Sequence, residues 1–331
     1  MDEPTDLAGQ LTAALRPLLP GLVAVDGLKR LTGGSSHDTW AFDAHREAGE
    51  GASPMPLILR REFAAPLFEM RLEAEFALLQ RLSAQGLQVP LPLACVHLDG
   101  PAMVMERVDG VDARKLMAQP TMPGIARALG QAIVAEQVRI HDAGTRALDD
   151  VVPRIADDTF AGELARWGAM IDAAQVASPA LMIARDWLEK NYPGPLTRAV
   201  IVHGDFKANN ILMRGGLQPI VIDWELAHVG DLHEDLAWTM AWTSPYDIVG
   251  GMLTREDYIA TYTALSGQRV DPQRLRFWQM FALVKLAAIF LKGIEPRLRG
   301  EPLQPLHLML GQAVPRLEMA IFDLLLAGEN G

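Results

Sequence analysis

The chain has 331 residues, half of them hydrophobic, which is enough to bury the cores of two lobes. Charged residues make up 21%, and 30 basic against 41 acidic side chains give a formal net charge of -11. This is not the composition of a disordered chain, and the acidic balance speaks against general attraction to nucleic acid or to an anionic membrane. We therefore expect a globular protein with neither nucleic acid nor membrane as partner.

Three features bear on the cellular compartment. Cys95 is the only cysteine, so the chain forms no internal disulfide. The N-terminal sequence MDEPTDLAGQ has no basic segment followed by an apolar run, and so does not predict a signal peptide. The most apolar stretch, Met280 to Leu291, carries Lys285 and is shorter than the roughly 20 residues of a membrane span. We expect a buried helix there and a cytoplasmic protein.

Short strand-like runs separated by turn signals fill the first third of the chain. The predicted strands are Leu28–Leu31, Thr39–Phe42, Leu57–Arg61, Leu91–Val96 and Met103–Val108. One helical pattern interrupts them, from about Phe68 to Leu82, with apolar residues at three- and four-residue steps.

After Asp109-Gly110 the patterns become mainly helical. Helices are predicted for Ile125–His141, Phe160–Ala174, Pro179–Lys190 and most of Arg255–Leu326, and short strands for Ala199–Val202, Ile211–Met213 and Pro219–Ile222. The order predicts an α+β protein with two lobes. Residues 1–108 form an N-terminal lobe with a small antiparallel sheet and one helix, and residues 109–331 form a larger, mainly helical lobe.

The most informative segment runs from Val200 to Trp238. A hydrophobic strand leads into His203-Gly204-Asp205, Asn210 follows five residues after Asp205, and a second hydrophobic strand leads into Asp223. This spacing suits phosphoryl transfer, in which Asp205 is the catalytic base and Asn210 and Asp223 hold Mg²⁺. The alternative, two capping aspartates and a turn asparagine, does not require the joint spacing.

With these residues the chain resembles the aminoglycoside phosphotransferase and choline kinase superfamily, from about Leu28 to its C-terminal helices. The phrase DWELAHVGD, with Asp235-Leu236-Ala237 shortly after it, resembles the phosphotransferase domains associated with acyl-CoA dehydrogenases. The resemblance implies a bilobal fold like that of protein kinases, with ATP and Mg²⁺ as cofactors.

The resemblance also assigns residues to the nucleotide. Arg60 matches the position that contacts the ATP phosphates, and Glu75 matches its acidic partner, with Glu73 as the competing candidate. The segment TGGSSHDT matches the loop that covers the phosphates, with Gly33, Gly34, Ser35 and Ser36 as donors, although an ordinary hairpin turn looks much the same. Residues 105–108 match the hinge that holds adenine, with Glu106 and Val108 as contacts.

Two further residues, Lys207 and Glu225, each have two possible roles. Lys207 matches a lysine that neutralises charge on the transferring phosphoryl group, or it is a solvated loop residue. Glu225 binds the acceptor, or it braces the loop. His203 is expected to brace the loop and not to act as a base.

Only eleven residues lie between Asp223 and Asp235, too few for the peptide platform of a protein kinase. The sequence therefore favours a small-molecule hydroxyl as acceptor. Hydroxyacyl-CoA and an aminoglycoside-type antibiotic are the narrower alternatives, and the family name alone does not imply antibiotic resistance. A nucleotide-binding pseudokinase scaffold is the alternative from another class. The sequence leaves the oligomeric state and the choice between ATP and GTP open.

Overall fold

The computed structural model describes residues 4–31, 37–47, 54–62, 70–119, 123–155, 159–196, 198–298, 300 and 311–327. The chain divides into two compact units. The first comprises Met1–Thr121, Ala143–Pro153 and Ala208–Ala227, and the second Met122–Asp142, Arg154–Lys207 and His228–Gly331. The predicted α+β class is confirmed, since the first unit holds an antiparallel sheet and the second is mainly helical. The predicted lobe boundary after Val108 stays a prediction.

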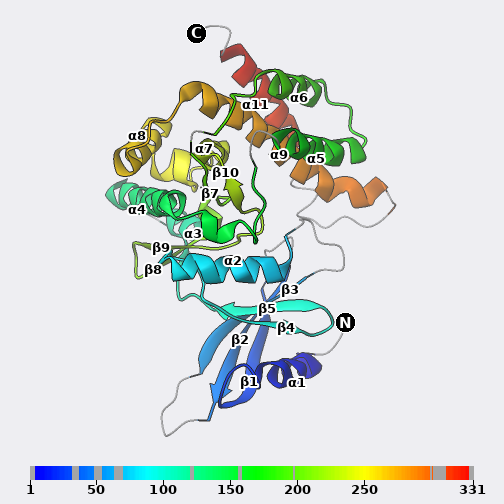
Figure 1. Ribbon diagram of the computed structural model, residues 1–331, viewed down its shortest axis with the longest axis vertical. Coiled ribbons are helices and arrows are strands. Elements are labelled where there is room, and N and C mark those ends of the chain that lie inside the picture. The colour runs from blue at the N-terminus through cyan, green and yellow to red at the C-terminus, as the bar shows by residue number, and fades with distance from the viewer. Residues whose placement is uncertain are drawn as a thin grey trace. The chain divides into compact units, whose positions relative to one another are not determined.

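The first unit is built on a five-stranded antiparallel sheet in the order β1-β2-β3-β5-β4 (Figure 1). Its strands are β1 (Leu22–Arg30), β2 (His37–Arg46), β3 (Met55–Glu62), β4 (Pro92–His97) and β5 (Pro101–Glu106). Helix α2 (Leu72–Ala84) packs against β4 and β5. Helix α1 (Pro4–Leu15), which the patterns did not predict, packs against β1 and adds Leu11 and Leu15 to the core of this unit.

A second sheet of the first unit carries two of the predicted site residues. It has the order β6-β8-β9, formed by β6 (Val111–Asp112), β8 (Ile211–Arg214) and β9 (Gln218–Val221). Asn210 ends the 3₁₀ helix η2 (Ala208–Asn210) directly before β8, and Asp223 follows β9. Helix α3 (Ala113–Met117) and the 3₁₀ helix η1 (Arg146–Leu148) complete the described elements of this unit.

The second unit is mainly helical. Its helices are α4 (Pro123–Asp142), α5 (Phe160–Ala173), α6 (Pro179–Lys190), α7 (Leu232–Ala241), η3 (Ile248–Met252), α8 (Arg255–Ser266), α9 (Pro272–Leu298) and α11 (Val314–Ala327). One antiparallel pair, β7 (Val200–Val202) with β10 (His228–Gly230), accompanies them. The three short strands predicted for this half of the sequence correspond to β7, β8 and β9, of which β7 pairs with β10 whereas β8 pairs with β9.

Helix α9 contains the apolar stretch singled out in the sequence. Its residues Pro272–Glu295 are long and apolar enough to cross a membrane, yet 72% of the most apolar window is buried inside the protein. The helix packs against α5, α6, α7 and α11. Since neighbouring helices cover it, α9 behaves as the buried helix that the sequence predicts.

Candidate active site

A cavity of about 500 Å³ lies in the first unit, a size typical of small-ligand pockets. Apolar side chains on or next to strands of both sheets form one part of its wall, namely Leu31, Ala41, Ile58, Met105, Leu212 and Ile222. The polar part includes the predicted residues Arg60, Glu75, Asn210 and Asp223. Glu106 and Val108, the predicted hinge contacts, also line it. The structure thus brings six predicted site residues to one cavity.

Arg60 is the centre of the polar wall. It lies on β3, and its guanidinium forms an ion pair with Glu75 of α2, a side chain that is only 1% exposed. Arg60 Nη2 also donates to Asp223 Oδ1 at 3.1 Å. Glu73, the competing candidate, is exposed. Of the two acidic residues it is therefore Glu75 that pairs with Arg60.

His37, at the start of β2, is a residue that sequence reasoning did not select. Its Nδ1 accepts a hydrogen bond from Arg60 Nη2 at 2.8 Å. Burial and the neighbouring Arg60 lower the pKa of His37 to about 4, so the imidazole is neutral at pH 7 and can act as this acceptor. The pKa of Arg60 itself is raised, because the carboxylates of Glu75 and Asp223 outweigh the effect of its burial. Arg60 thus stays positively charged in the cavity wall.

Asp223 has an uncommon backbone conformation. Its φ is +69°, in the left-handed region that residues other than glycine seldom adopt. Its side chain is 33% exposed, so a carboxylate oxygen remains accessible beside Arg60. The Asn210 carbonyl accepts from Ile222 N at 2.9 Å, which ties the start of β8 to the residue before Asp223.

The oxygen atoms of Asp223 and Asn210 suit a hard divalent cation. Among the described residues, no group of three or more His, Cys, Asp and Glu side chains is arranged to hold a metal. Mg²⁺ takes one or two protein ligands and completes its shell with water and phosphate oxygens, and Asp223 and Asn210 stay its predicted ligands.

Glu225 lies close to the same group of side chains. It is buried, with Oε2 at 3.3 Å from His37 Nδ1 and at 3.9 Å from Arg60 Nη2. The proximity of Arg60 fits a role of Glu225 in bracing the loop, one of its two predicted roles. The contact with an acceptor stays a prediction.

The predicted base lies in the second unit, in the loop after β7. Gly204 has a φ of +79°, which favours glycine at this position. Asp205 Oδ1 accepts from Trp238 Nε1 at 2.8 Å, and Oδ2 lies 2.9 Å from Lys207 Nζ. Lys207 Nζ in turn lies over the Trp242 ring, 4.7 Å from its centroid. The carboxylate therefore has one neutral and one cationic donor, one on each oxygen.

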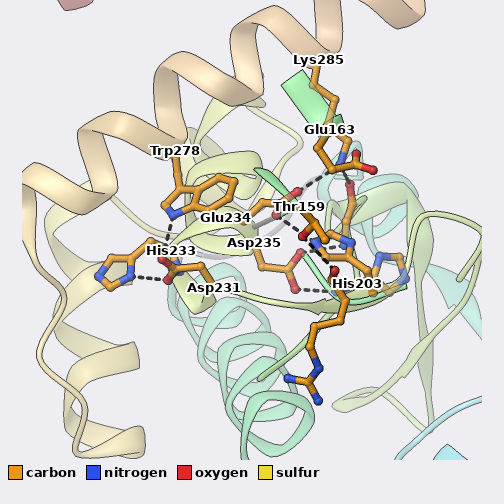
Figure 2. A network of polar contacts seen from close by, with 12 residues as sticks. Thr159, Glu163, His203, Asp231, His233, Glu234, Asp235, Trp278 and Lys285 are labelled. Carbon is orange, nitrogen blue, oxygen red and sulfur yellow. Dashed lines mark hydrogen bonds and ion pairs between the residues drawn. The ribbon is translucent and has the colours of Figure 1, made fainter. Parts of the chain in front are cut away.

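Helix α7 holds the backbone of this loop (Figure 2). The fully buried Asp235 carboxylate accepts from the backbone N–H groups of His203 and Gly204, both at 2.8 Å. Although burial raises the pKa of Asp235, its hydrogen bonds with His141 and His203 lower it overall, so it stays ionised. His203 Nδ1 accepts from the backbone N–H of Asp205 at 3.2 Å. His203 thus acts as the brace that the sequence predicts.

Helix α9 secures α7 and the loop through two sets of polar contacts. Lys285 Nζ, from the apolar helix, donates to the Gly204 carbonyl at 3.1 Å and lies 3.3 Å from Glu234. At the start of α7, the N-cap residue Asp231 accepts from Trp278 Nε1 at 2.8 Å and pairs with Arg274. Figure 2 shows Trp278 and Lys285 reaching from α9 toward α7.

Sequence reasoning therefore found the residues with predicted roles in the cavity and the loop, but not all of the residues that support them. Gly33, Gly34, Ser35 and Ser36 lie outside the described residues. The missed residues include His37, Trp238 and Lys285. A signal existed for the last one, because a single lysine in an apolar helix needs a buried partner. The sequence also contained a signal for Trp238, because this residue lies three residues after Asp235 on the same helix face.

Comparison with known proteins gives a consistent picture. The model of the phosphotransferase enzyme family matches residues 27–278. Acyl-CoA dehydrogenase family member 10 of Mus musculus is 27% identical over 276 residues, which are 73% of this chain and 24% of that protein. Homoserine kinase of Beijerinckia indica is 30% identical over 229 residues, 60% of this chain and 64% of the kinase.

The fold is shared with solved phosphotransferases. Spectinomycin phosphotransferase, solved with ADP and spectinomycin, superposes with a TM-score of 0.65 at 14% identity, covering 96% of this chain and 98% of that one. The chain spans about a quarter of the length of the mouse dehydrogenase relative, so it corresponds to one part of that protein.

Proposed function

Since the chain belongs to the phosphotransferase enzyme family, we propose that it transfers the γ-phosphoryl group of ATP to a hydroxyl of a small molecule. The observation that carries this proposal is the wall of the cavity in the first unit. There a guanidinium, held by Glu75 and His37, lies beside the accessible carboxylate of Asp223. A cation next to oxygen ligands is the arrangement that a nucleotide with a bound divalent metal requires.

On the nucleotide side, Arg60 contacts the phosphates through the N–H groups of its planar fork. Asn210 and Asp223 would hold Mg²⁺, which would neutralise charge on the phosphate oxygens. The backbone at Glu106 and Val108 would hold adenine, and the phosphate contacts expected of Gly33, Gly34, Ser35 and Ser36 stay predictions.

On the acceptor side, Asp205 takes the proton of the acceptor hydroxyl as its oxygen forms a bond to the γ-phosphorus. The bond between that phosphorus and the β,γ-bridging oxygen breaks, and ADP leaves with the electron pair. Lys207, paired with Asp205 at 2.9 Å, moderates the negative charge on the transferring group.

The acceptor class has several candidates. The likeness to homoserine kinase supports a small amino alcohol, and the likeness to the dehydrogenase relative supports a hydroxyacyl-CoA. The fold shared with spectinomycin phosphotransferase keeps aminocyclitol and aminoglycoside acceptors in the set. Glu225 is the proposed acceptor contact, and the cytoplasm is the proposed location.

A coupled ADP-release assay tests the proposal. The protein is incubated with MgATP or MgGTP and with L-homoserine, choline, kanamycin, spectinomycin or 3-hydroxybutyryl-CoA. We expect ADP release that depends on one class of acceptor and stops when EDTA is added. Nucleotide binding without acceptor-dependent release in any combination would contradict the proposal and favour the pseudokinase alternative.

A further inference from the structure

Three residues of helix α7 form hydrogen bonds with consecutive residues of the predicted catalytic loop. Asp235 binds the N–H groups of His203 and Gly204, and Thr239 Oγ1 donates to the carbonyl of Phe206 at 3.0 Å. Trp238 lies between them on the helix and donates from its indole to Asp205, the residue between Gly204 and Phe206. Asp235 and Thr239 fix backbone groups, whereas Trp238 is the side chain of α7 that fixes the reacting carboxylate.

We propose that Trp238 is a positioning residue that orients the Asp205 carboxylate to accept the proton of the acceptor hydroxyl. The inference rests on the proposed function, and it adds a residue whose contribution is separate from nucleotide binding.

Geometry favours Trp238 over Lys207 as the group that sets the orientation. The terminal torsion of an aspartate is broad, so the carboxylate plane turns freely unless a donor fixes it. The indole is rigid, is 2% exposed and lies on a helix that Asp231 caps. Lys207 is a flexible side chain whose Nζ lies over the face of Trp242. A donor that cannot move fixes the carboxylate, while a flexible one can follow the transferring charge.

The contacts with Trp238 and Lys207 are compatible with proton transfer to Asp205. A carboxylate oxygen has two lone-pair directions, so an oxygen that accepts one hydrogen bond can still accept a proton. With Oδ1 held by the Trp238 indole at 2.8 Å, the plane of the carboxylate is fixed for this transfer. The O–H bond breaks as the oxygen–phosphorus bond forms, and the proton stays on Asp205 until product leaves.

The chain offers a matched control for the test. Trp278 Nε1 donates to Asp231 Oδ2 at 2.8 Å, so it also is a buried indole bound to a buried carboxylate, but on a residue outside the catalytic loop. Trp238→Phe and Trp278→Phe each remove one indole N–H and keep an aromatic ring. Both variants are compared with the wild type by thermal unfolding, and then in the ADP-release assay with whichever of L-homoserine, kanamycin and 3-hydroxybutyryl-CoA the wild type phosphorylates.

We expect Trp238→Phe to lower kcat about tenfold, the effect of one lost hydrogen bond to a charged group, while the KM for MgATP stays within about twofold. Trp278→Phe, which removes a contact to Asp231 and not to Asp205, should lower the Tm and change kcat by less than about twofold. An unchanged kcat in folded Trp238→Phe, or equal losses in both variants, would overturn the positioning role and leave the proposed function in place.

A double-mutant cycle covers the case in which the Tm of Trp238→Phe is also lowered. In the Asp205→Asn background, Trp238→Phe should cost less than twofold in kcat, because the carboxylate that it positions is already gone. An equal tenfold loss in both backgrounds would mean that Trp238 acts only through folding, and would overturn the inference. Absence of wild-type turnover with all five acceptors of the ADP-release assay would instead overturn the proposed function and the inference together.

Discussion

At the scale of single residues, the cavity of the first unit is organised around one guanidinium. Arg60 faces the carboxylates of Glu75, Asp223 and Glu225 and the neutral imidazole of His37. Glu75 is buried in its ion pair with Arg60, whereas the Asp223 side chain is partly exposed. The negative charge that Arg60 does not balance therefore lies where a divalent cation would bind.

Replacement of Arg60 tests this arrangement. Arg60→Lys keeps the charge but loses the fork, so we expect the Kd for MgATP, measured by isothermal titration calorimetry, to rise about tenfold. Arg61→Lys is the matched control, because the adjacent Arg61 pairs with Asp38 and is not part of the cavity wall. Equal affinities for the wild type and Arg60→Lys would contradict a phosphate contact at Arg60.

His37 predicts a pH dependence of stability. Its pKa in the folded protein is about 4, below the ordinary value of about 6.5, so the unfolded chain binds a proton first as the pH falls. The stabilisation is complete above pH 6.5 and is lost between about pH 6.5 and 4, by up to about 3 kcal/mol. Urea unfolding across this range should show a shallower slope for His37→Asn than for the wild type. His97→Asn, at an exposed site on β4, should keep the wild-type slope.

At the scale of elements, two helices of the second unit hold the catalytic loop together. Helix α7 supplies Asp235, Trp238 and Thr239, and α9 supplies Lys285, which binds the Gly204 carbonyl. Lys285 also pairs with Glu234, which contacts His228 at 2.9 Å. Although burial by itself raises the pKa of Glu234, His228 and Lys285 hold it below its ordinary value.

A second double-mutant cycle measures the coupling between α7 and α9. Lys285→Met should lower the free energy of unfolding by about 3 to 5 kcal/mol, because it leaves the Glu234 charge buried without this partner. Adding Glu234→Gln should recover part of that loss, since the buried charge is then removed as well. If the losses in the free energy of unfolding measured with urea were strictly additive, the two side chains would not interact.

The sequence predicted elements best where the periodicity was strong and the pairing local. Strands β2, β3 and β5 and helix α2 follow from alternation and from helical spacing, and the motif spacing identified Asp205, Asn210 and Asp223. Helix α1 was missed because its short amphipathic pattern lies in an acidic N-terminal segment. The separation of β7 from β8 and β9 depends on tertiary pairing with β10, which a linear pattern does not contain.

The site residues that the sequence did not predict were missed for the same physical reason. His37 and Trp238 owe their roles to partners that are distant in sequence, Arg60 and Asp205. The choice between Glu73 and Glu75 also depended on which helix face meets β3, and the structure resolves it because Glu75 is buried and Glu73 is exposed. Contacts between elements, and not composition, determine which residues at such positions take part in the site.

At the scale of the whole molecule, the predicted functions are divided between the two units. The cavity with the nucleotide and metal residues belongs to the first unit, and the base and its supporting helices belong to the second. Substitutions of Asp205 or Trp238 in the second unit are therefore expected to lower turnover and to leave nucleotide affinity nearly unchanged. Substitutions in the cavity wall should affect affinity first.

The most direct test of the account is Asp205→Asn, measured on the acceptor that the wild type phosphorylates. Asn keeps the shape of the side chain and the contact with Trp238 but cannot take the hydroxyl proton. We expect kcat to fall by about 10²- to 10⁴-fold, with the Kd for MgATP within about threefold of the wild type. A variant that retains wild-type turnover would contradict Asp205 as the base, and with it the proposed mechanism.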